Sequence, residues 1–156
     1  MTSFTLTHWS LLLLHGLMSV ALLGAVSHQT LGCWQTNSAA ARTGFLSRYA
    51  SAEGAIFAYP VVLLFLTTFT LGALIYPEYR LGARYAIEEM RLLGIVGLFE
   101  LKEHCLALCL GLLPLYVWAW RHPAAQKIRA LSTTTLAGVL WFSFLVGHLV
   151  NNVRGL

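Results

Sequence analysis

The sequence predicts an all-α integral membrane protein, a four-helix bundle, and three observations support this fold class. Hydrophobic residues make up 58% of the 156 residues and charged residues only 10%, against about 25% charged in an ordinary soluble domain. Four long apolar stretches each approach or exceed the ~20 residues that a helix needs to cross a bilayer. A helix satisfies its own backbone polar groups in hydrocarbon, so we expect one multi-pass transmembrane domain over residues 1–156. The predicted helices cover about 9–31, 55–76, 92–120 and 131–152.

The first apolar stretch differs from a signal peptide. No Lys or Arg precedes it within residues 2–7, and its length exceeds the ~7–15 apolar residues typical of a signal peptide. We therefore expect a retained helix. The second helix is expected to end at Tyr76, because Pro77 follows it and proline disrupts the helical hydrogen bonds. The charges after Pro77 are spaced to suit an interfacial helix over about 83–98.

Four membrane helices place both termini and the segment between the second and third helices on one side, the near side. Lys and Arg residues are divided almost equally between the two sides, so the positive-inside rule discriminates little between the two orientations. The uncharged N-terminus and the short basic segment after the third helix favour termini on the non-cytoplasmic side.

Three histidines on three different helices are predicted to lie at nearly the same depth. At about 1.5 Å rise per residue, His15 and His104 lie roughly 7 Å, and His148 roughly 10 Å, to the near side of the centre of their helices. Polar side chains in hydrocarbon are costly, and those that occur there tend to be functional. We therefore predict the functional site at this level.

Other polar residues accompany these histidines. On the third helix Glu100 precedes His104 by four residues and shares its face, and Glu103 flanks that face. Asn152 shares the face of His148 on the fourth helix. We expect Glu100, Glu103 and Asn152 to transfer protons or to hydrogen-bond to the ligands and orient them. Lys102 points the other way and is expected to snorkel or to meet a carboxylate.

Two imidazoles from facing helices are the usual axial ligands of haem b in a membrane bundle, so His15, His104 and His148 are candidate haem ligands. The same histidines with Glu100 or Glu103 suit a direct metal site, and a quinone or proton site is a third reading. Which histidines pair stays open. Cys105 and Cys109 are four residues apart, unlike the Cys-x-x-Cys of thiol oxidoreductases, and are expected to pack in the core.

The architecture and histidine placement resemble small four-helix membrane cytochromes b and the anchor subunits of respiratory complexes. This resemblance implies an electron-transfer subunit that binds haem b or quinone within a larger membrane complex. If the chain belongs to an enzyme, we expect an electron-transferring subunit of a membrane oxidoreductase, since phosphate-loop and nucleophile-elbow motifs are absent. The alternatives are a cofactor-free accessory subunit and a small transporter with a metal or proton site. The expected partners are the lipid bilayer and other membrane proteins, not nucleic acid.

Overall fold

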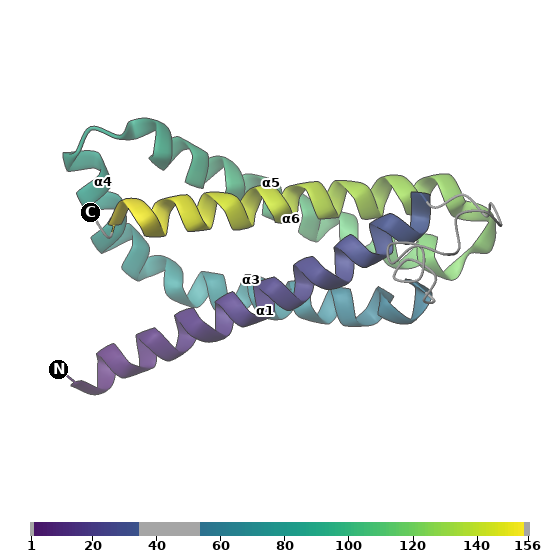
Figure 1. The fold of residues 1–156 in the computed structure, drawn as a ribbon, viewed down its shortest axis with the longest axis horizontal. Helices are drawn as coiled ribbons and strands as arrows, with labels where there is room; N and C mark the ends of the chain where they lie inside the picture. The colour runs from purple at the N-terminus through teal and green to yellow at the C-terminus, as the bar shows by residue number, and fades with distance from the viewer. Residues whose placement is uncertain (1, 35–53, 155–156) are drawn as a thin grey trace, which may run out of the picture.

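The computed structural model describes residues 2–34 and 54–154, and every regular element in these ranges is a helix (Figure 1). The all-α prediction is confirmed. Four long helices form an elongated bundle, and short helical turns join them. The long helices are α1 (Thr2–Trp34), α3 (Ala58–Glu78), α5 (Leu93–Arg121) and α6 (Gln126–Arg154). The short elements are η2 (Gly54–Phe57), the π-helical η3 (Tyr79–Ala83), α4 (Arg84–Glu89) and η4 (Pro123–Ala125).

Within the residues that the structure describes, three segments are long and apolar enough to cross a membrane, so the chain is an integral membrane protein of helical type. They are Trp9–Trp34 in α1, Gly54–Glu89 around α3, and Pro123–Val153 around α6. Helix α5 has a comparable length of 29 residues but includes Glu100, Lys102 and Glu103. A fourth membrane span through α5 stays a prediction.

Helix α1 packs against α3 and α6, and α5 packs mainly against α6. Both chain ends and α4 lie at the near side, on the left of Figure 1, whereas η2 and η4 lie at the opposite end, the far side. The larger core cluster joins all four long helices through fully buried residues such as Val26, Val61, Tyr116 and Leu136. A smaller near-side cluster joins α4, α5 and α6 through Ile87, Phe99 and Val150, among others.

Two boundaries differ from the sequence prediction. The second helix does not stop at Tyr76: Pro77 lies inside α3, and the chain continues as the π-helix Tyr79–Ala83. Proline removes one backbone donor and crowds the preceding turn, and the π-helical turn begins two residues after it. The amide of Tyr79 still reaches the carbonyls of Ile75 and Tyr76, so the helical path continues.

The predicted interfacial helix over 83–98 is also divided. Helix α4 ends at Glu89, and α5 begins at Leu93. Between them Arg91 has a φ of 57°, in the left-handed region that reverses a helical path. The charge spacing indicated helix on both sides of this turn, and the turn residues Met90, Arg91 and Leu92 include no glycine or proline that would mark a break.

Candidate functional site

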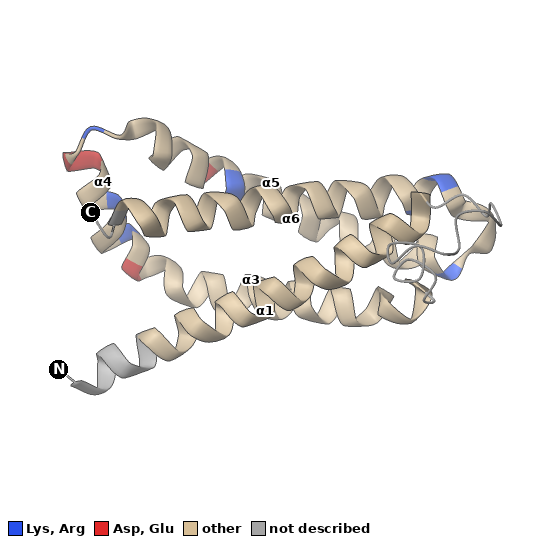
Figure 2. Ribbon diagram, viewed as in Figure 1, with Lys and Arg blue, Asp and Glu red and all other residues tan. Residues whose placement is uncertain are grey.

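Charged side chains gather at the near side, where Figure 2 shows acidic and basic residues on α4 and on the first part of α5. Arg84 of α4 donates through Nε to Glu88 Oε1 at 2.8 Å, one turn along its own helix. Its Nη1 lies 3.1 Å from Glu100 Oε1 of α5. One guanidinium therefore joins two carboxylates and fixes α4 against α5.

Lys102 lies over an aromatic ring rather than in an ion pair with one of these carboxylates. Its Nζ is 3.7 Å from the centroid of the Phe99 ring, a cation–π arrangement. The ring of Tyr79 stacks on Phe99 with centroids 3.7 Å apart. The half-buried ammonium group is thus held within the bundle, where the sequence predicted snorkelling or a carboxylate partner.

His15 is bonded in a way that determines which ring nitrogen bears the proton. Its Nδ1 is 3.1 Å from the carbonyl oxygen of Thr68 in α3. A carbonyl only accepts hydrogen bonds, so Nδ1 donates, and the neutral ring keeps its lone pair on Nε2. Gly72 makes room for the ring, because a Cβ there would lie 3.3 Å from His15 Cε1.

His104 has the same arrangement. Its Nδ1 donates to the carbonyl oxygen of Glu100, one turn earlier on α5, at 2.7 Å, which leaves Nε2 of the neutral ring as the acceptor. Histidines that ligate metals commonly donate their other ring N–H to a backbone carbonyl or carboxylate. Two of the three predicted ligands, His15 and His104, therefore donate through Nδ1 and keep a free lone pair on Nε2 in the neutral ring.

The histidines share a level along the bundle. Tyr116 of α5 donates a hydrogen bond to Gln29 of α1, so these two residues lie at one level. Their sequence numbers differ by 87, and the two helices run in the same direction (Figure 1). The same offset of 87 residues places His15 level with Lys102, two residues before His104. His148 lies between Val146 and Val150, which share a cluster with Phe99.

The side chains do not form one cluster. Within residues 2–34 and 54–154, no group of three or more His, Cys, Asp or Glu residues is arranged to hold a metal ion. His15 is half-buried, whereas His104, His148, Glu100 and Asn152 are exposed on the surface of the chain, and Glu103 is half-buried. The ring of His148 meets that of Phe144 edge-on, with centroids 4.5 Å apart. Their assignment as haem or metal ligands stays a prediction.

A polar network on the far side was not predicted from the sequence. The hydroxyl of Tyr116 donates to Gln29 Oε1 at 2.5 Å, and Gln29 Nε2 donates to the carbonyl of Gly54 at 2.7 Å. Both side chains are fully buried. Gln29 thereby joins α1, α5 and η2 at one point. A glutamine within an apolar stretch was the available signal, since an amide in hydrocarbon needs a partner.

Comparison with known proteins gives one partial similarity. No family model and no solved structure matches the chain significantly. A stretch of 98 residues, 61% of this chain, is 35% identical to the protein described as "Probable metal-nicotianamine transporter YSL6" from Arabidopsis thaliana. The matched region is 14% of that protein's length, so the chain corresponds to a small part of it.

Proposed function

We propose that this chain is a membrane component of a transport system for a metal ion or a small metal complex. The observation that supports the proposal is the 98-residue similarity to a plant protein named as a metal-nicotianamine transporter. The near side adds a physical argument, because ionisable residues within membrane helices commonly mark ion or substrate paths. Transport is thus favoured over the electron-transfer function that the histidine pattern suggested.

The near-side residues offer two kinds of contact to a chelated metal. His15 and His104 each present a ring Nε2, a ligand atom that suits zinc, copper, iron and nickel. Arg84 and Lys102 add positive charge at the same end, and cationic side chains bind carboxylates such as those of organic chelators. In this proposal the imidazoles coordinate the metal, and the Arg84 and Lys102 side chains bind the carboxylates of the chelator.

Flux measurements test this proposal. The full chain is reconstituted in liposomes that contain a metal-sensitive dye, and Zn²⁺ or Fe²⁺ is added outside, with and without nicotianamine. We expect dye quenching that depends on the protein, with His15→Ala and His104→Ala slowing it at least tenfold, about 1.4 kcal/mol in activation free energy. Flux equal to that of empty liposomes would contradict the proposal.

His122→Ala is the matched control for His104→Ala. His122 is exposed on the far side, and its Nδ1 donates to the carbonyl of Trp118 one turn earlier, at 2.8 Å, as His104 does to Glu100. Its loss removes the same local bond but leaves the near side intact. We expect wild-type flux in this variant, and an equal loss in His122→Ala and His104→Ala would contradict a specific near-side path.

A second candidate function is electron transfer through haem b or quinone. The common level of the histidines and the free Nε2 of His15 and His104 favour it. His104 and His148 are exposed on the surface of the chain, so a haem bound through either would lie at the periphery, beside a partner subunit. Haem would supply one-electron chemistry there, while this chain would contribute the ligand and its orientation.

A reduced-minus-oxidised visible spectrum of the gently purified chain separates the two functions. A b-type spectrum that disappears in His15→Ala or His104→Ala would establish the cytochrome function. Metal flux without a haem spectrum would support transport. If neither a haem spectrum nor metal flux is observed, the remaining function is that of a cofactor-free accessory subunit of a larger membrane complex.

A further inference from the structure

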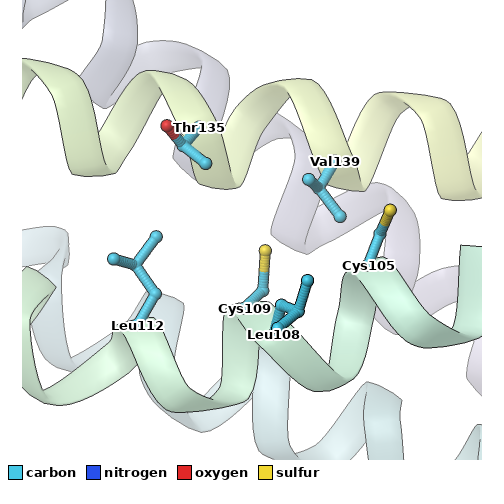
Figure 3. Close-up of a pocket in the computed structure, with 6 residues that line it drawn as sticks. All are labelled: Cys105, Leu108, Cys109, Leu112, Thr135 and Val139. Carbon is cyan, nitrogen blue, oxygen red and sulfur yellow. The ribbon is translucent and has the colours of Figure 1, made fainter.

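A cavity of about 290 Å³ lies between α5 and α6, and on α5 its lining begins at Cys105, the residue after His104. Figure 3 shows its walls: Cys105, Leu108, Cys109 and Leu112 of α5 face Thr135 and Val139 of α6. The lining is apolar apart from two thiols and one hydroxyl. Both sulfur atoms point across the gap toward α6 in this view.

We propose that Cys105 and Cys109 form a two-thiolate site for Cu(I) in this cavity. Both cysteines are free thiols, Cys109 buried and Cys105 half-buried. Residues four apart share one face of a helix, with Cβ atoms about 5–6 Å apart, so one ion can lie between the two sulfur atoms. The proposal is based on this geometry alone, and only its role as a step in transport rests on the proposed function.

The ligand set explains the choice of metal. Soft thiolate ligands suit Cu(I), which accepts two of them, whereas Zn²⁺ in proteins is almost always four-coordinate. The cavity offers only the Thr135 hydroxyl besides the two sulfurs. Binding replaces two S–H bonds by two Cu–S bonds and releases two protons, with no change in oxidation state. The bound unit has one negative charge, which is less costly in an apolar cavity than two separate thiolates.

Differential alkylation of the wild-type chain tests the site. The chain is kept reduced and anaerobic in detergent, one equivalent of Cu(I) or Zn²⁺ is added, and labelling by a small thiol reagent is read by peptide mass spectrometry. We expect Cu(I) to slow labelling of Cys105 and Cys109 at least about tenfold and to leave Cys33 unchanged, with little effect of Zn²⁺. Unchanged labelling of both, or equal protection of Cys33, would overturn the proposal.

Cu(I) affinity, measured by competition with a chromogenic chelator, provides a second test that does not depend on thiol accessibility. Cys105→Ser and Cys109→Ser are expected to weaken binding at least about 100-fold, because each removes one of two ligands. Cys33→Ser is the matched control, and helical content by circular dichroism verifies folding. Wild-type affinity in Cys105→Ser or Cys109→Ser would overturn the site. Tight Cu(I) binding without liposome flux would contradict the transport proposal but retain the copper site.

Discussion

The far side holds a buried, neutral hydrogen-bond network, whereas the near side holds ion pairs whose side chains reach the surface. Gln29 and Tyr116 are fully buried and hydrogen-bonded within the bundle. Arg84, Glu88 and Glu100 remain partly exposed although they form ion pairs. A buried neutral network holds helices together, because breaking it leaves buried polar groups without hydrogen-bond partners. A partly exposed charged group contributes less to stability and stays available to a ligand. We therefore expect the far-side network to contribute more to stability than the near-side ion pairs.

Removal of the far-side amide should have the largest effect on stability. Gln29→Ala leaves the Tyr116 hydroxyl and the Gly54 carbonyl without their partner, and we expect a loss of about 2–3 kcal/mol in the free energy of unfolding. Unfolding in sodium dodecyl sulfate, followed by circular dichroism, measures it. Ser19→Ala is the control, since Ser19 bonds only back to the carbonyl of His15. Equal stability of both variants would show that the far-side network does not hold the bundle.

Two glycine substitutions should act in opposite directions. A Cβ at Gly54 would lie 2.6 Å from the Trp120 ring, whose Nε1 donates to Thr133, so Gly54→Ala should cost about 1–2 kcal/mol. Gly138 of α6 has nothing within 4 Å of an added Cβ, so Gly138→Ala should stabilise the helix by about 0.5–1 kcal/mol. Thermal unfolding of the two variants in one detergent measures both shifts. Stabilisation by Gly54→Ala would contradict the tight far-side packing.

The smallest effect on stability is expected from the near-side ion pairs. Arg84→Gln removes the contacts to Glu88 and Glu100, whose side chains are 40% and 48% exposed, so the loss of stability should be smaller than in Gln29→Ala and should shrink in high salt. Chemical unfolding at low and high salt measures it, with the exposed Arg80→Gln as control. A loss that matched Gln29→Ala and persisted in high salt would remove the distinction between the two sides.

The sequence predicted the features that depend on composition and spacing. Four apolar stretches indicated the long helices, and the rise per residue indicated the common level of His15 and His104. The orientation of side chains about each helix was harder to predict, because it depends on tilt and on the neighbour that each helix contacts. His104 therefore lies on the exposed surface although its spacing suggested an inward face. The Gln29–Tyr116 bond joins residues 87 positions apart, which no local pattern specifies.

The π-helix Tyr79–Ala83 has a consequence for the alignment of α4 with α5. A π-turn is equivalent to one extra residue inserted into an α-helix. With that residue deleted, an uninterrupted α-helix would turn every later side chain by about 100° around the axis. Arg84 would then face away from Glu100 without any substitution in the ion pair itself. The number of residues between Pro77 and Arg84 therefore sets the direction in which Arg84 points from α4. Insertions or deletions should be tolerated least in that stretch.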